Sequence, residues 1–375
     1  MALTKYKLGE LITLCTGGNE DLRFDRSFVK GISIDKTFME TKADLTGISL
    51  ANYTVVEPKC FSFVTVTSRN GNKISIAYND SDESFLVSSF YVTFRLNEFG
   101  KTVLLEDYLY MFFNRNEFDR YARRDSWGSA REYFYFDNIC DVEITLPSIS
   151  IQQKYVDIYK AMIANQQSYE RGLEDLKLAI DGMLDQIKTE APQIPLGELL
   201  AEIDNRNSDK AQSLVYGVTM SKQFIPSVAN LDGVDISKYK LVATDQIACN
   251  FMHVGRDKSL PLAINQTDDP IVVSPAYFVF EKASEMCLPE YIVMWLSREE
   301  SGRYCWFISD SSVRGGFSLE QFYSITIPVT SIDQQYALTS IYNSYITRKE
   351  INDKLKMQIK SICPILIKGS LEETK

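Results

Sequence analysis

The pattern of hydrophobic and polar positions divides the chain into stretches of two kinds. Short bursts of β-branched and aromatic residues, such as 61–66 and 89–94, are separated by turn signals such as Asn-Gly and Asp-Asp-Pro. These bursts predict strands and turns, and helical stretches such as 107–124 lie between them. Residues 1–147 and residues 193–328 both have this character. The pattern therefore predicts two similar domains of mixed α/β structure.

The other two stretches, 148–192 and 329–375, have the pattern of long helices. Their apolar residues recur in steps of four and three, which is the spacing of a coiled-coil seam, although Pro364 is expected to weaken the second seam. Because neither helix buries its apolar stripe alone, we expect the two helices to pair as an antiparallel coiled coil; the alternative is that each helix packs on its own domain. The residues predicted to form the helix pair are Ile151, Tyr155, Ile158, Met162, Leu173, Leu176, Ile180, Leu355, Ile359 and Ile362.

The chain also repeats itself. A shift of 186 in the numbering lays Tyr53 on Tyr239 and Tyr91 on Tyr277. The shift is 188 near the start of the repeat, 183 towards its end and 181 at the beginning of the long helices, which small insertions and deletions in loops explain. Each copy has the length of an ordinary domain, far above the period of a solenoid. A duplicated module presents two similar, separately diverged surfaces, and this organisation favours a binding protein.

Composition narrows the class of protein. The seven cysteines are odd in number and include no C-x-x-C pair, so we expect buried free thiols and neither a disulfide framework nor a zinc site. The N-terminus lacks the apolar core of a signal peptide and no run is long enough to span a membrane, which predicts a cytoplasmic protein. The net charge of -10 counts against nucleic-acid binding, although a binding face can be locally basic on an acidic molecule.

Motifs for catalysis are missing from the sequence. It contains one histidine, His253, no G-x-x-x-x-G-K-[ST] loop for ATP, and no adjacent prolines of the kind found in the catalytic tetrapeptide of base methyltransferases. We therefore predict no catalytic residue and no metal ligand, and expect the chain not to be an enzyme on its own.

Several short segments carry a family resemblance. Residues 8–11 match 196–199, and the segments 311–319, 325–328 and 332–335 close the second module and open its helix. Their first-copy counterparts are 128–131, 146–147 and 151–153. In this order and duplication, the chain resembles the DNA-specificity (S) subunit of type I restriction-modification systems. It departs from the family pattern where the proline-rich run before each helix is reduced to Pro147 and Pro328, and where a glutamate-glutamine pair has lost its glutamate.

The resemblance implies a role in defence against foreign DNA. Each target recognition domain would read one half of a bipartite, asymmetric site in double-stranded DNA. The helices would dock two modification (methyltransferase) subunits, and two restriction (translocase-nuclease) subunits would join for cleavage. The chain itself would hold no cofactor, and S-adenosylmethionine, ATP and Mg²⁺ are expected on the partner subunits.

The candidates for DNA contact lie mainly in turns. Arginine pairs bidentately with guanine and asparagine with adenine in the major groove, and Gly71 lets the turn 68–73 approach DNA closely. The alternatives are solvated hairpin tips for the turns, and a structural arginine that holds the domain to its helix at positions 131 and 314. Arg206, Lys210 and Lys222 are weaker candidates, because scattered surface charges are usually only solvated. The predicted DNA-binding residues are Arg69, Asn70, Asn72, Lys73, Arg123, Arg124, Arg131, Arg256, Lys258 and Arg314.

Two other functions stay open at this point. One is a duplicated, two-lobed hydrolase or glycan-processing enzyme that uses paired carboxylates, such as Asp268-Asp269 or Glu299-Glu300. The other is a solitary DNA-binding or scaffold protein of the same family, which competes for partners.

Overall fold

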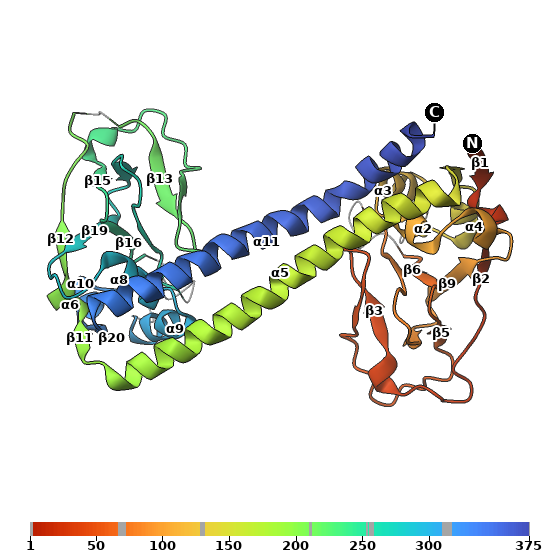
Figure 1. The fold of residues 1–375 in the computed structure, drawn as a ribbon, viewed down its shortest axis with the longest axis horizontal. Coiled ribbons are helices and arrows are strands. Elements are labelled where there is room, and N and C mark those ends of the chain that lie inside the picture. The colour runs from red at the N-terminus through yellow and green to blue at the C-terminus, as the bar shows by residue number, and fades with distance from the viewer. Residues whose placement is uncertain are drawn as a thin grey trace. The chain divides into compact units, whose positions relative to one another are not determined.

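The computed structural model describes residues 3–66, 73–127, 132–209, 212–252, 254, 259–309 and 317–374. The chain forms two compact units, Met1–Tyr169 with Ile351–Lys375 and Glu170–Glu350 (Figure 1). Each unit contains one α/β module and part of each long helix. Among the described residues, no helix has the length and apolar character needed to cross a lipid bilayer.

The first module is built on an antiparallel sheet of four strands. The sheet has the order β2 (Ile12–Leu14), β9 (Tyr91–Leu96), β6 (Phe61–Val64), β7 (Ile76–Tyr78). Three separate strand pairs complete the described sheets: β1 (Thr4–Lys7) with β10 (Glu143–Leu146), β3 (Lys30–Ile32) with β4 (Phe38–Glu40), and β5 (Thr54–Val56) with β8 (Phe85–Val87).

Helices pack an aromatic core onto this sheet. The described helices of the module are η1 (Leu8–Glu10), η2 (Arg26–Phe28), α1 (Gly100–Val103), α2 (Glu106–Phe113), α3 (Asn116–Arg124) and α4 (Phe136–Cys140). Phe61 stacks on Phe94 with 5.3 Å between ring centroids, and Phe113 meets Phe61 edge-on. The stretch 107–124, expected to be helical, is two helices, because Arg115 has extended φ and ψ angles of -88° and 144°.

The second module repeats this plan with a larger second sheet. One four-stranded sheet has the order β12 (Leu200–Ile203), β19 (Tyr277–Lys282), β16 (Ile247–Asn250), β17 (Leu262–Ile264). The other has the order β14 (Phe224–Pro226), β13 (Val215–Val218), β18 (Ile271–Val273), β15 (Lys240–Val242), and β11 (Gln193–Pro195) pairs with β20 (Thr326–Pro328). The described helices are α6 (Leu196–Leu199), η3 (Ile236–Lys238), α8 (Pro289–Leu296), α9 (Glu299–Ile308) and α10 (Leu319–Ser324).

Individual hydrogen bonds repeat between the modules. The buried Asn79 donates from Nδ2 to the carbonyl oxygens of Val56 and Glu83. Its equivalent in the second copy, Asn265, donates in the same way to Val242 and Asp269. The predicted duplication is therefore confirmed at the level of single side chains.

The two long helices are α5 (Ile149–Glu190) and α11 (Ile332–Glu372). Helix α11 continues through Pro364, although proline removes one backbone donor and normally costs about 3 kcal/mol inside a helix. Beyond it, Leu366 and Ile367 are buried in the core of the first unit. The helix and its buried face therefore both continue beyond Pro364.

In the first unit, the two helices run antiparallel. Tyr155, early in α5, hydrogen-bonds through its hydroxyl to Glu373, just beyond α11, while Gln166, later in α5, bonds Asn352, earlier in α11. A Cβ atom on Gly369 would lie 3.0 Å from the Tyr155 ring, so the glycine permits this close approach. In the second unit, residues 183–190 of α5 and 334–341 of α11 line a shared groove. The predicted antiparallel pair is confirmed.

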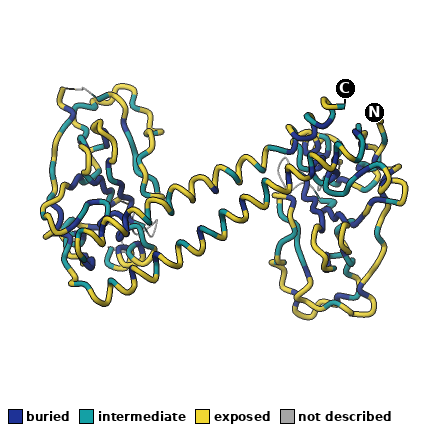
Figure 2. Tube along the Cα trace, viewed as in Figure 1, coloured by how far each residue is buried: buried dark blue, intermediate teal, exposed yellow. Residues whose placement is uncertain are grey.

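The buried face of α5 differs from the predicted one in the first unit. Ile158, predicted to form the helix pair, is 40% exposed, whereas Val156 and Tyr159 are buried. Figure 2 shows buried and exposed residues alternating along the long helices. The buried positions include Gln152 and Gln166, which a search for apolar residues passes over. Further along α5, Leu173 and Ile180 are buried and Leu176 is half-buried. The remaining predicted positions are half-buried: Ile151, Tyr155, Met162, Leu355, Ile359 and Ile362.

Candidate nucleic-acid interface

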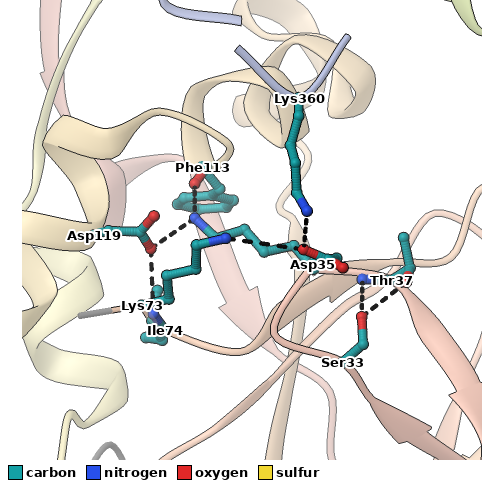
Figure 3. A network of polar contacts seen from close by, with 9 residues as sticks. Ser33, Asp35, Thr37, Lys73, Ile74, Phe113, Asp119 and Lys360 are labelled. Atoms are coloured by element: carbon teal, nitrogen blue, oxygen red, sulfur yellow. Dashed lines mark hydrogen bonds and ion pairs between the residues drawn. The ribbon is translucent and has the colours of Figure 1, made fainter. Parts of the chain in front are cut away.

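A buried ion pair lies at the base of the first candidate reading turn. Lys36 follows β3 in a left-handed conformation with φ 63°, and its Nζ lies 2.8 Å from Oδ1 of Asp119 on α3. Nζ also donates a hydrogen bond to the carbonyl oxygen of Phe113. The same Asp119 oxygen accepts from the backbone N–H of Ile74, which directly follows the predicted turn 68–73 (Figure 3). Burial lowers the pKa of Lys36, and the Asp119 carboxylate opposes that shift.

Lys73 is the only predicted reader of this turn within the described residues. Its Nζ lies 3.8 Å from Oδ1 of Asp35, an oxygen that also lies 2.7 Å from Nζ of Lys360 on α11 (Figure 3). The hydrogen bond from Lys360 lowers the pKa of Asp35. Lys73 is thus engaged with an acidic side chain of its own module, at the edge of the turn.

The second module reaches a related arrangement with a different partner. Lys222, the equivalent of Lys36 in the repeat, has the same left-handed backbone with φ 64°. Its Nζ donates to Ser259 Oγ at 2.9 Å and to the carbonyl oxygen of Leu260, the equivalent of Ile74. Towards the end of the repeat, Asp119 corresponds to Gly302 in α9.

Lys222 is half-buried and was underestimated as a scattered surface charge. Within the described part of the chain, no Asp or Glu carboxylate forms an ion pair with it. Burial lowers the pKa of Lys222 to about 8. The residue also lines a cavity of about 660 Å³ that lies within the second unit.

Most of the predicted reading residues fall outside the described residues, and so does the single histidine, His253. Those predicted residues are Arg69, Asn70, Asn72, Arg131, Arg256, Lys258 and Arg314.

Arg123 and Arg124 are the two predicted DNA-binding arginines that the structure describes. They end helix α3 and are paired within the module. Arg123 forms an ion pair with Glu132, and Arg124 with Asp125 at 2.9 Å. The guanidinium of Arg124 also lies over the Tyr121 ring, 5.2 Å from its centroid. The adjacent Trp127 is 73% exposed. The end of α3 therefore presents ion-paired arginines beside an exposed aromatic ring.

The matching surface of the second module was not among the predicted site residues. In this part of the repeat, Arg123 and Arg124 correspond to Trp306 and Phe307 near the end of α9. Phe307 is 80% exposed and Trp306 44% exposed. The repeat alignment contained this signal, because it sets two aromatic residues opposite two arginines. The two modules therefore present different chemistry at equivalent positions.

The acidic pairs considered for an enzyme lie at separate places. Glu299 and Glu300 open α9, where Glu299 pairs with Arg303 at 3.5 Å and Glu300 pairs with Lys188. Asp269 lines the cavity beside Lys222. Among the described residues, no three His, Cys, Asp or Glu side chains are placed to share a metal ion.

Comparison with known proteins finds a family model that matches the first module and the start of the first long helix. Residues 4–177 match the family model of the type I restriction modification DNA specificity domain. This part of the chain is therefore similar to that domain. The resemblance to S subunits that the sequence motifs predicted is therefore confirmed. No curated protein matches the chain.

Solved structures share the fold along the whole chain. The S subunit of a type I restriction-modification system from M. genitalium is 13% identical, with a TM-score of 0.60, and the match covers 100% of this chain and 96% of that one. The HsdS subunit from Thermoanaerobacter tengcongensis is 10% identical over 100% and 97% of the two chains, with a TM-score of 0.43. A chain from a type I R-M system studied for complex assembly is 11% identical over 98% of each chain, with a TM-score of 0.48. The first of these likenesses supports the fold.

Proposed function

We propose that this chain is the DNA-specificity subunit of a type I restriction-modification complex. The match of residues 4–177 to the specificity domain carries the proposal. The repeated hydrogen bonds of Asn79 and Asn265 extend it to the second copy. In this proposal residues 1–147 and 193–328 are target recognition domains, and each reads one half of a bipartite, asymmetric site in double-stranded DNA. Residues 148–192 and 329–375 are the helical regions between and after them.

The helices dock two modification subunits in this proposal, and two restriction subunits join for cleavage. Exposed apolar side chains on both helices support a docking role: Leu178 on α5 and Met357 and Ile365 on α11 all have more than half of their surface exposed. Methyl transfer, translocation and cleavage then belong to the partners, together with S-adenosylmethionine, ATP and Mg²⁺. Such a complex acts in the cytoplasm, where it meets DNA.

The chemistry of the two modules supports two separate readers. In the first, Arg69, Asn70 and Asn72 supply the side chains that pair bidentately with guanine and adenine. In the second, Arg256 and Lys258 occupy the corresponding turn. Phosphate contacts from Arg123, Arg124, Arg131 and Arg314 would fix the position of the protein on the duplex without specifying sequence.

The decisive experiment is methylome sequencing of a strain that expresses the chain with a cognate modification subunit. We expect methylation at one bipartite motif, which disappears when this chain is omitted. The purified chain alone should bind DNA weakly, because the complex supplies further phosphate contacts, and this weak binding should be sensitive to salt. Methyl transfer by the chain alone, or an unchanged motif in its absence, would overturn the proposal.

Variants of the turns separate the two half-sites. Changing Arg69, Asn70 and Asn72 together to alanine should relax the first half of the motif, at about 1 to 3 kcal/mol for each lost bidentate contact. Changing Arg256 and Lys258 to alanine should relax the other half. Equal loss at both halves in either variant would contradict the assignment of one reader to each module.

A further inference from the structure

Two lysines hold the chain at equivalent places beside the two candidate turns. Lys36 and Lys222 occupy the same position of the repeat, and both have a positive φ at a tight turn between two paired strands. This backbone conformation is uncommon for a residue with a side chain and is found where the surrounding structure demands it. In both copies the turn directs a lysine side chain into the module, towards the segment that follows the candidate reading turn.

In the first module the contact passes through Asp119. The carboxylate is 2.8 Å from Lys36 Nζ and accepts the backbone N–H of Ile74 at 3.2 Å. Both Lys36 and Asp119 are buried, so water does not replace either contact. Asp35, next to Lys36 in sequence, forms ion pairs with Lys73 and Lys360 (Figure 3). Ile74 is therefore held by a buried contact, whereas Lys73, the last residue of the turn, makes an exposed ion pair.

In the second module the contact is direct. Lys222 Nζ donates to Ser259 and to Leu260, which directly follow the turn 255–258. Glycine occupies the position of Asp119 in the second module. Lys222 therefore bonds the backbone carbonyl oxygen of Leu260 directly. In the first module, Lys36 bonds the Asp119 carboxylate, which in turn accepts from the backbone N–H of Ile74. The two modules thus hold the same point of the chain with opposite backbone groups.

We propose that Lys36, acting with Asp119, and Lys222 are positioning residues that fix the base of the reading turn in the first and the second module respectively. The inference rests on the proposed function. Base readout requires donors and acceptors held to within a fraction of an ångström by residues that do not themselves touch DNA. Loss of either lysine relaxes sequence discrimination at its own half-site and leaves the other half-site unchanged.

The test uses the complete complex of this chain with its modification subunits. Methylation is measured on a library of duplexes randomised in one half-site at a time. We expect Lys36→Met to lower discrimination at the first half-site by roughly ten-fold to a hundred-fold, the effect of one lost bidentate contact, and Lys222→Met to do so at the second. Matched controls are Lys30→Met and Lys282→Met, which change lysines that pair at the surface with Glu40 and Glu285.

A double variant separates positioning from folding. Replacing a buried ion pair by apolar residues of similar size often preserves stability, so Lys36→Met with Asp119→Leu should unfold near the wild-type midpoint. It still leaves the Ile74 N–H without its acceptor, and we expect discrimination at the first half-site to stay low. Recovery of discrimination along with stability would overturn the inference, since the pair would then serve folding alone.

Two further outcomes are decisive. Loss at both half-sites, or at neither, in the single variants would overturn the inference while the wild-type complex still methylates a bipartite site. A wild-type complex that shows no bipartite recognition would instead overturn the proposed function, and the inference with it.

Discussion

Gln152 and Gln335 make the same three hydrogen bonds from equivalent positions in the two units. The side-chain oxygen of Gln152 accepts from the N–H of Leu105, and its Nε2 donates to the carbonyl oxygens of Val103 and Pro147. Gln335 does the same with the N–H of Leu288 and the carbonyl oxygens of Met286 and Thr330. The glutamines and all their partners are related by one and the same shift in numbering. In each unit a fully buried glutamine ties the first turn of a long helix to the loop before the helix and to its own module.

These bonds predict that Gln152→Leu destabilises the first unit strongly. Leucine fits a buried helical position but leaves one backbone N–H and two carbonyl oxygens without partners, at about 1 to 3 kcal/mol for each group that water does not reach. We expect a loss of several kcal/mol in the free energy of unfolding, measured by urea titration. The neighbouring Gln153 is exposed and bonds only Asp157, so Gln153→Leu is the matched control and should change stability by less than about 0.5 kcal/mol. Equal effects of the two substitutions would contradict this role.

The same glutamines show which parts of the fold could be predicted from the sequence and which could not. Two α/β modules and two long helices were predictable from apolar residues alone. Short apolar runs indicate the strands, and apolar residues spaced by four and three indicate the long helices. The predicted alignment of the two copies at the start of the long helices was wrong. The expected shift paired Gln153 with Gln334, whereas the hydrogen bonds pair Gln152 with Gln335. The buried face contains polar side chains at these positions, and apolar periodicity carries no information about them.

The ion pair at the base of the candidate site could not be predicted from the sequence, for a related reason. Asp119 and Lys36 are far apart in sequence, and a buried ion pair has no local signature that distinguishes it from surface charge. Lys222 was grouped with solvated residues, although the repeat already placed it opposite Lys36. Comparing the two copies residue by residue would have singled out this lysine, and also Trp306 and Phe307 opposite the arginines of α3.

Asp119→Asn should destabilise the first unit, because it leaves the buried ammonium of Lys36 without a counter-charge. Breaking a buried pair by removing one partner costs about 3 to 5 kcal/mol. Glu117 on the same helix pairs with Arg120 at 3.5 Å on the surface, so Glu117→Gln is a control for loss of one acidic charge from α3. We expect the control to change the unfolding midpoint little. If Asp119→Asn behaved like the control, the Lys36 contact would have no energetic role.

Lys222 should make the stability of the chain depend on pH in alkaline solution. Its pKa is about 8 in the folded chain, against an ordinary value of 10.5, because burial disfavours the charged form. Between these two values the unfolded chain binds more protons, so stability rises as pH increases from about 8 towards 10.5. The groups whose charges act on it are the buried thiols of Cys249 and Cys305, and burial raises the pKa of both, which makes their contribution fall with increasing pH.

The comparison with Lys222→Met isolates the lysine from those thiols. The difference in unfolding free energy, wild type minus variant, should rise by roughly 1 to 3 kcal/mol from about pH 7.5 to the alkaline limit of the assay, on the basis of about 1.4 kcal/mol for each pKa unit. Urea titrations of both proteins at matched ionic strength measure it. A difference that is flat, or that falls with pH, would show that the folded-state pKa is not lowered.

The helix pair offers two leucine-sized positions that differ almost only in burial. Ile180 on α5 is 5% exposed and packs in the core of the second unit, whereas Leu178, on the same turn of the helix, is 75% exposed. Ile180→Asp places an unpaired carboxylate among apolar side chains, which should cost several kcal/mol or drive the carboxyl to stay protonated.

Leu178→Asp should leave the thermal midpoint nearly unchanged. It should nevertheless weaken assembly with the modification subunit, if the exposed apolar side chains of α5 form the docking surface. Thermal unfolding and pull-down of the modification subunit measure the two effects separately. Two variants that unfold alike would contradict the packing of α5, and full assembly of Leu178→Asp would exclude this side chain from the docking surface.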